Sequence, residues 1–249
     1  IKPLVAQDGL FVGLQNGMTI DDVASIMGAE RTLGAVIEVA AGMFEPGVVV
    51  RQTGPAGTWF GIGAYDEQTL GREAEVADVL RHAGEVEIKD DIRSAKWMKL
   101  VVNAAEFLPS SILNLPLAEA VELPGIRDVM IASGREAVRT AMALGHELVP
   151  IFGNKRIEAN DPDSYATVLL DAVLTGWTLQ DTKVTVLQDW LKERRAEVDD
   201  INGLVVREQL RLGGEAPVNA RLVEIAHRIE RGELKADAAN ADLLRSLLV

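Results

Sequence analysis

Two polar residues interrupt an apolar stretch near the middle of the chain. Lys99 and Asn103 lie four residues apart in the run Ala95-Lys96-Trp97-Met98-Lys99-Leu100-Val101-Val102-Asn103. In a helix, residues four apart share one face, one turn from each other. A lysine that is held away from water has a lowered pKa and can work as a general acid near neutral pH, which makes this pair a candidate for acid catalysis. The alternative is a lysine that reaches the surface beside a solvated asparagine.

Two other polar positions have a structural and a functional interpretation. Asn16 follows the apolar segment 10–14, and with Gly17 it forms a strong turn dipeptide. At the carboxyl end of a strand such a loop faces the ligand crevice, although an ordinary turn is the simpler interpretation. Glu197 is expected in the first turn of a helix over 197–212, where it either interacts with the helix dipole at the surface or accepts a ligand hydroxyl in a cleft.

The hydrophobic pattern of the chain changes near residues 90–94. Before this point, β-branched and aromatic segments separated by glycine and proline predict strands over 10–14, 33–39, 47–52, 58–63 and 85–88, and amphipathic segments predict helices over 20–28 and 66–83. After it the period is helical almost to the end, beginning with a helix over 96–111. We therefore predict an α/β domain over residues 1–92 and an all-helical domain over residues 93–249.

The composition excludes several classes of site and partner. A net charge of −13, spread along the chain, argues against nucleic acid and anionic membranes as partners. No run of 18 apolar residues is present, so no membrane span is predicted. The chain has no cysteine, and His82, His146 and His227 lack the spacing of metal ligands, so no metal site is predicted.

One glycine pair imitates a cofactor loop. Gly61-Ile62-Gly63 precedes a predicted helix, but Asp66 stands at the third glycine position, where its charge would repel a pyrophosphate. The chain has no other glycine-rich phosphate loop. Its first apolar segment starts at Leu10, too early for a complete domain before it, so we expect the sequence to begin partway into a longer protein.

Four motifs follow one another in a specific order. They are Leu14-Gln15-Asn16-Gly17, Lys99-Leu100-Val101-Val102-Asn103, Leu187-Gln188-Asp189 with Glu197-Val198-Asp199-Asp200-Ile201-Asn202-Gly203, and Pro217-Val218-Asn219. Each is weak alone, but their order and separations resemble the ketopantoate reductase (2-dehydropantoate 2-reductase) family over essentially the whole chain. The resemblance implies the remainder of a Rossmann-type NADP-binding domain, without its glycine-rich start, followed by a helical C-terminal domain similar to that of 6-phosphogluconate dehydrogenase. It also implies an active site in the cleft between them.

The resemblance further implies roles for individual residues. Lys99 matches the lysine that donates a proton to the substrate ketone as hydride arrives from NADPH. By the same motifs, Asn103 and Thr185 are expected to contact the substrate. Asn16 and Glu197 are expected to contact both substrate and cofactor, and Ala40 is expected to contact the cofactor.

Two positions depart from the family pattern. Phe107 stands where the family often has a second asparagine, and Leu117 where it has a further substrate asparagine. We expect a cytoplasmic enzyme that reduces a 2-oxo acid to a 2-hydroxy acid with NADPH, as in pantothenate biosynthesis; a homodimer is compatible with the resemblance. The alternatives are the same chemistry on a more apolar keto substrate, and a truncated, non-catalytic binding or dimerisation fragment.

Overall fold

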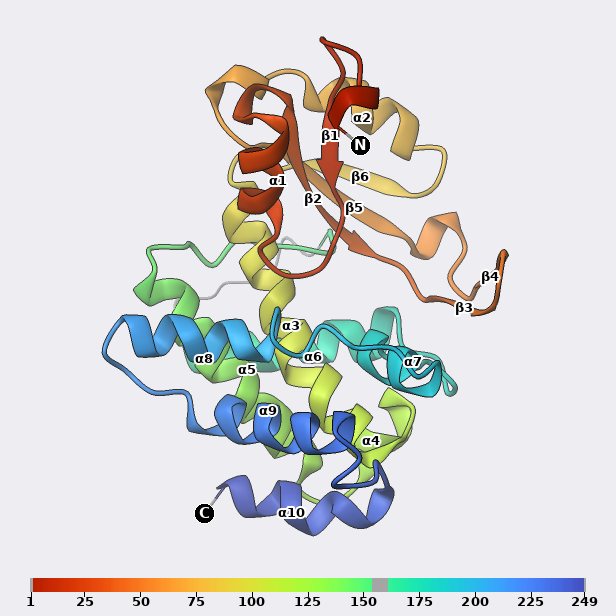
Figure 1. The fold of residues 1–249 in the computed structure, drawn as a ribbon, viewed down its shortest axis with the longest axis vertical. Coiled ribbons are helices and arrows are strands. Elements are labelled where there is room, and N and C mark those ends of the chain that lie inside the picture. Colours follow the sequence, from red (N-terminus) through yellow and green to blue (C-terminus); the bar gives the residue numbers. More distant parts are fainter. Residues whose placement is uncertain (1, 154–160, 249) are drawn as a thin grey trace. The chain divides into compact units, whose positions relative to one another are not determined.

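The computed structural model describes residues 2–153 and 161–248 (Figure 1). The chain divides into two compact units. The sheet unit comprises Ile1–Ala41, Val50–Lys99 and His146–Ile157, and the helical unit comprises Gly42–Val49, Leu100–Gly145 and Glu158–Val249. The predicted fold class, an α/β part plus an all-helical part, is confirmed. The boundary at residues 92–93 stays a prediction, because the division into units falls after Lys99, inside helix α3 (Ile92–Leu113).

A mixed sheet forms the centre of the sheet unit (Figure 1). Its strands are ordered β1 (Phe11–Gly13), β2 (Thr32–Glu38), β5 (Trp59–Ala64) and β6 (Glu85–Ile88). Strand β2 runs parallel to β1 and antiparallel to β5, and β5 runs parallel to β6. Four of the five predicted strands are confirmed here. The Gly61-Ile62-Gly63 segment lies inside β5 and forms no phosphate loop.

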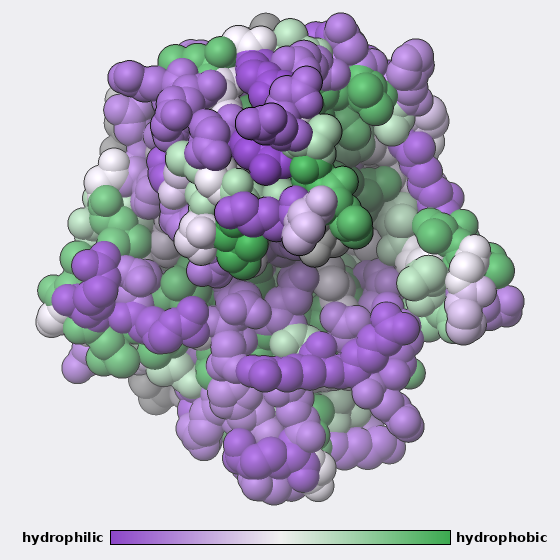
Figure 2. Space-filling model, turned by 45° about the horizontal axis from the view of Figure 1, so that its top comes forward, coloured by the Kyte–Doolittle hydropathy of each residue, from purple (hydrophilic) through white to green (hydrophobic). Residues whose placement is uncertain are grey.

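The β3–β4 hairpin was only half predicted. Strand β4 (Val48–Arg51) was expected, but its partner β3 (Ala41–Glu45) was not. Figure 2 shows hydrophobic side chains gathered over this hairpin, and its exposed large hydrophobic residues are Met43, Phe44, Val48, Val49 and Val50. Because an exposed hairpin buries neither face, its sequence lacks the alternation that identifies a half-buried strand.

The helix predicted over residues 66–83 is wrong in its extent. The side chain of Asp66 caps a short 3₁₀ turn (Glu67–Thr69), accepting from the Gln68 N–H at 2.8 Å. Gly71 then adopts φ +86°, and helix α2 covers only Glu73–Leu80. Left-handed backbone of this kind interrupts regular helix, so Leu70, within the predicted range, lies outside α2 and is 63% exposed.

A pair of glycines fixes the start of α3 against the sheet. Gly34 and Gly63 face each other across β2 and β5. A Cβ atom on Gly34 or Gly63 would lie 2.7 Å from atoms of the Ile92 side chain, which is itself buried. The missing side chains therefore let the first residue of α3 pack onto the strands, and this contact sets the position of the lysines that follow one and two turns later.

In the helical unit, α3 continues beyond Lys99, and α5 (Ile126–Ala143) contacts several of the other helices. The other helices are α4 (Leu117–Glu122), α6 (Pro162–Gly176), α7 (Thr185–Leu191), α8 (Asn202–Arg211), α9 (Pro217–Glu230) and α10 (Ala241–Arg245). Helix α5 packs against α6, α8 and α9. A Cβ on Gly134 would lie 3.1 Å from that of Ala166, so the glycine permits close approach of α5 and α6. In the part of the chain that the structure describes, no helix has the length and apolar character to cross a membrane.

Candidate functional site

Lys96 is anchored inside the sheet unit by two backbone carbonyls. Its Nζ donates to the carbonyl oxygen of Gln15 at 2.9 Å and to that of Ala35 at 3.3 Å, and the residue is 3% exposed. Burial lowers the pKa of Lys96 to about 8. This lysine therefore joins α3 to the turn after β1 and to the middle of β2.

Lys99, one turn further along α3, forms a buried ion pair with Glu38 at the end of β2. The ammonium donates to Oε2 of Glu38, and both side chains are about nine-tenths buried. The Lys99 Nζ also lies 5.3 Å from the ring centroid of Phe152, which in turn meets Trp59 edge to face at 5.8 Å. Strand β2, helix α3 and the 146–153 segment thus all contribute to the surroundings of one amine.

The two lysines and Asn16 line one small cavity of the sheet unit. Its volume is about 10 Å³, and its wall includes the Leu14–Gly17 turn, residues 35–37 of β2, Lys96 and Lys99. A space of this size holds about one water molecule or one ligand atom. The structure therefore brings together Asn16 and Lys99, two of the residues that the sequence singled out.

Asn103 is the most unusual buried polar residue of α3. It is fully buried, and among the described residues neither its amide nitrogen nor its amide oxygen has a hydrogen-bond partner. A buried, unpaired polar group costs about 1–3 kcal/mol, so such a group calls for an explanation. One explanation is a ligand that supplies an acceptor for the amide nitrogen and a donor for the amide oxygen.

Ala40 lies just after β2 and is buried. Its N–H donates to the Thr53 hydroxyl at 3.0 Å, and its carbonyl accepts from the backbone N–H of Gln52 at 2.8 Å. Because both backbone groups are engaged within the chain, only its methyl group remains to contact a ligand.

Thr185 and Glu197 belong to the helical unit. Thr185 is half-buried at the first position of α7. Glu197 is half-buried in a turn, where its carbonyl accepts from the N–H groups of Asp200 and Ile201, and α8 begins only at Asn202. The expected helix over 197–212 therefore starts five residues late, and Glu197 does not occupy a first helical turn.

The asparagines of two other motifs have structural partners. The Asn202 Nδ2 donates to the Ala104 carbonyl and to Oδ1 of Asn219, both at 2.9 Å. The Asn219 Nδ2 donates to the Ser133 carbonyl at 3.0 Å and to Oε2 of Glu136 at 2.7 Å. Glu136 also accepts from the N–H groups of Val218 and Asn219 at the start of α9, each at 2.9 Å. This Ser133–Glu136–Asn202–Asn219 cluster joins α3, α5, α8 and α9.

Phe107 and Leu117, the two departures from the family pattern, lie in the core of the helical unit. They are 4% and 1% exposed. The Leu117 N–H donates to the Thr182 carbonyl at 3.0 Å, which ties the start of α4 to the segment before α7.

The sequence analysis missed Glu38 and the pairing of Lys96. A charged residue inside the apolar strand 33–39 and a second lysine inside the apolar run before Lys99 were both visible signals. The sequence does not show which groups these residues contact, because Glu38 and Lys99 are 61 residues apart, as are Ala35 and Lys96.

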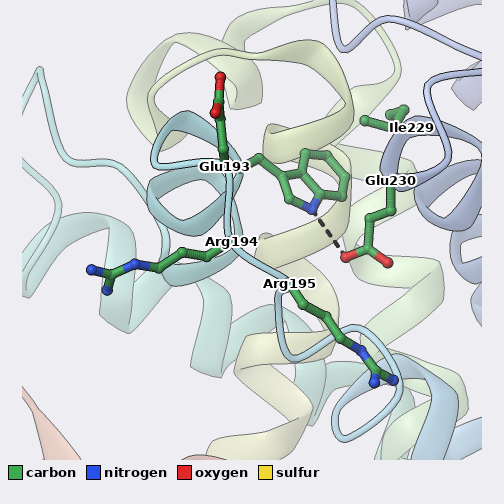
Figure 3. A pocket seen from close by; sticks show the side chains of 6 residues that line it. Glu193, Arg194, Arg195, Ile229 and Glu230 are labelled. Carbon is green, nitrogen blue, oxygen red and sulfur yellow. Dashed lines mark hydrogen bonds between the residues drawn. The ribbon is translucent and has the colours of Figure 1, made fainter.

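A larger depression of the helical unit contains none of the predicted site residues. Its volume is about 510 Å³, and it is lined by Trp190, Glu193, Arg194, Arg195, Ile229 and Glu230 (Figure 3). The Trp190 Nε1–H donates to Oε1 of Glu230 at 3.2 Å, while the side chains of Arg194 and Arg195 point in different directions. The two arginines are exposed and do not converge on one point, so the residues around α3 remain the candidate functional site.

The family match and the similar proteins of known name point to the same family. Residues 91–230, more than half of the chain, match the family described as "Ketopantoate reductase PanE/ApbA C terminal". A 2-dehydropantoate 2-reductase of Archaeoglobus fulgidus is 28% identical over 225 residues, which are 90% of this chain and 69% of that protein. The chain spans 65% of a second such relative, from Pyrococcus horikoshii, which is 25% identical over 86% of this chain.

Solved structures show the same architecture. A PanE/ApbA family ketopantoate reductase from Ralstonia eutropha superposes with a TM-score of 0.74 at 27% identity, covering 93% of this chain and 70% of that one. A D-mandelate dehydrogenase, solved with NADH and anilino(oxo)acetate, superposes with a TM-score of 0.80 at 20% identity, covering 93% and 71%. The second likeness concerns the fold alone.

Proposed function

Because the chain belongs to the ketopantoate reductase family, we propose that it reduces a 2-oxo acid to the 2-hydroxy acid with NADPH, as part of a longer, cytoplasmic, homodimeric enzyme. Within that protein, residues 1–92 would complete the Rossmann-type NADP-binding domain and residues 93–249 would bind substrate and form the dimer. The observation that carries the proposal is Lys99, a buried lysine that shares a cavity with Asn16.

The residues present suit the reacting end of such a complex. The amide of Asn103, with both atoms unpaired among the described residues, can accept from a substrate hydroxyl and donate to a carboxylate. Asn16 supplies a further amide on the wall of the Lys99 cavity. By the family resemblance, Thr185 would contribute a hydroxyl to the substrate, Glu197 a carboxylate to substrate and cofactor, and Ala40 a small side chain beside the cofactor.

Hydride is supplied by NADPH when it is bound. As the ketone carbon accepts hydride, its oxygen becomes an alkoxide that must take up a proton. Nζ of Lys99 carries this proton. Transfer of this proton leaves the hydroxy acid and a neutral amine, and the amine regains a proton from solvent. A positioned general acid of this kind contributes about 10²- to 10⁴-fold to the rate.

A more apolar keto substrate is the second candidate, and it is favoured by the apolar side chains of Phe107 and Leu117 at two family asparagine positions. Comparing kcat/KM for ketopantoate with kcat/KM for 2-oxo acids of larger apolar side chain separates the two substrate classes.

The test is NADPH oxidation by the full-length protein against a panel of 2-oxo acids. We expect turnover that falls at least about 100-fold in Lys99→Ala. Lys235→Ala, which removes an exposed lysine of the helical unit, is the matched control and should keep full activity. Absence of turnover in the parent protein, or full turnover in Lys99→Ala, would contradict the proposal.

A further inference from the structure

We propose that Glu38 is a positioning residue for Lys99, and that its carboxylate holds this amine and aims it at the Asn16 cavity. The inference rests on the proposed function for its catalytic consequence, but the contact itself does not. Glu38 lies outside the four motifs that the chain shares with the ketopantoate reductase family.

The first argument is the cost of burying the two charges. Both side chains are about nine-tenths buried, and each would be severely destabilised if it were ionised alone in that environment. An ammonium buried in this way is stabilised by an anion in contact with it, and Glu38 supplies that anion to Lys99. A proton donor needs this charged form at the start of each catalytic cycle.

The second argument is geometry. Glu38 is the last residue of β2, where the strand is fixed by its register with β5, which pairs Glu38 with Trp59. The same Trp59 packs edge to face on Phe152, whose ring lies 5.3 Å from Nζ of Lys99. Carboxylate and aromatic ring thus both neighbour the amine. An ammonium has three N–H donors, so one can remain on Glu38 while another reaches a ligand atom.

The third argument is strain in the segment that carries the aromatic ring. Phe152 has φ +63°, in the left-handed region that bulky residues rarely adopt. The segment is held to the sheet unit through its neighbour Pro150, whose carbonyl accepts from Nζ of Lys89 at 2.8 Å. Backbone strain of this kind persists where the surroundings impose it, and here it keeps an aromatic ring over the amine.

The expected consequence is a selective effect on the chemical step. Glu38→Gln keeps the size of the side chain but removes its charge, so we expect kcat of the full-length enzyme to fall at least tenfold with less than about a twofold change in KM. The solvent deuterium isotope effect on kcat should rise, because proton transfer becomes slower relative to the other steps. Glu38→Asp retains the charge and should recover part of the lost rate.

The control is Glu45→Gln, which removes an exposed carboxylate from strand β3. It should leave kcat, KM and the isotope effect unchanged. Circular dichroism and thermal unfolding establish that each variant is folded.

A second measurement does not depend on turnover. Amine acylation at neutral pH, followed by peptide mass spectrometry, reports how readily Lys99 reacts as a neutral amine. Without the carboxylate the amine loses the ion pair that holds it in place, so we expect Lys99 to be acylated severalfold faster in Glu38→Gln than in the parent protein, with Lys96 unchanged. Faster acylation in a protein that shows no turnover would support the Glu38–Lys99 pairing and count against the proposed function. Parent-like acylation and parent-like kcat in a folded Glu38→Gln variant would overturn the inference.

Discussion

The two buried polar clusters of this protein differ in how completely their groups are paired. In the helical unit, Asn219 uses its backbone N–H and both ends of its amide within the Ser133–Glu136–Asn202–Asn219 cluster. Along α3, Lys96 and Lys99 of the sheet unit bring ammonium groups to a cavity, and Asn103, further along the helix in the helical unit, has an amide without a partner among the described residues. The first arrangement fastens helices to one another, and the second leaves the amide of Asn103 available to a ligand. Burial alone therefore does not separate structural from functional polar residues.

The largest expected effect on stability comes from the paired cluster. Asn219→Ala removes donors and an acceptor from buried partners, and leaving such groups unpaired costs about 3 kcal/mol in the free energy of unfolding. Urea denaturation of the variant measures this loss. A loss below about 1 kcal/mol would show that the cluster does not fasten α9 to α5 and would remove the contrast between the two regions.

The sheet unit should instead show a pH-dependent stability. The pKa of Lys96 is lowered to about 8, below its ordinary value of 10.5, so between these values the unfolded chain binds a proton that the folded chain has lost. Stability therefore rises as the pH increases from about 8 to 10.5, by about 3 kcal/mol, and lies at its lower level below pH 8.

Lys96→Met tests this pH dependence. The rise should be missing in the variant and retained in the exposed control Lys235→Met, as followed by urea denaturation at several pH values. An identical rise in Lys96→Met and in the parent protein would assign it to another group.

A smaller stability effect, of opposite sign to that of Asn219, is expected at Asn103. Asn103→Leu replaces an unpaired buried amide with an apolar side chain of similar size, so stability should stay constant or rise by about 1 kcal/mol. The same change removes a proposed substrate contact, so KM for the 2-oxo acid should rise about tenfold. Loss of more than 2 kcal/mol of stability would indicate that the amide has a structural role like that of Asn219.

The sequence could predict which segments carry the chemistry but not their partners. The strands at 33–39 and 58–63 and the helix containing Lys99 follow from local periodicity, since each is long and clearly patterned. The error over 66–83 arose because the hydrophobic pattern continues across Gly71, and only the φ of that residue ends the regular helix. Asn219 and Asn103 are both asparagines beside apolar residues, and only contacts between distant segments distinguish the paired Asn219 from the unpaired Asn103.

The smallest effect is expected at the depression in Figure 3, which belongs to neither cluster. Glu193 lines it with φ +55°, and replacing a left-handed residue by glycine relieves about 1 kcal/mol of backbone strain while increasing the entropy of the unfolded chain. Glu193→Gly should therefore change stability by no more than about 1 kcal/mol and leave NADPH oxidation unchanged. A large loss of activity would place functional chemistry in the depression.

The central claim is that Lys99 delivers the proton in a hydride-transfer reaction. Single-turnover reduction of a 2-oxo acid by the full-length enzyme, mixed with stoichiometric NADPH, measures that step without product release. We predict that Lys99→Met slows this single turnover at least about 100-fold while the Kd for NADPH changes less than about twofold. A Lys99→Met enzyme that oxidises NADPH at the parent rate in this single turnover would contradict the account.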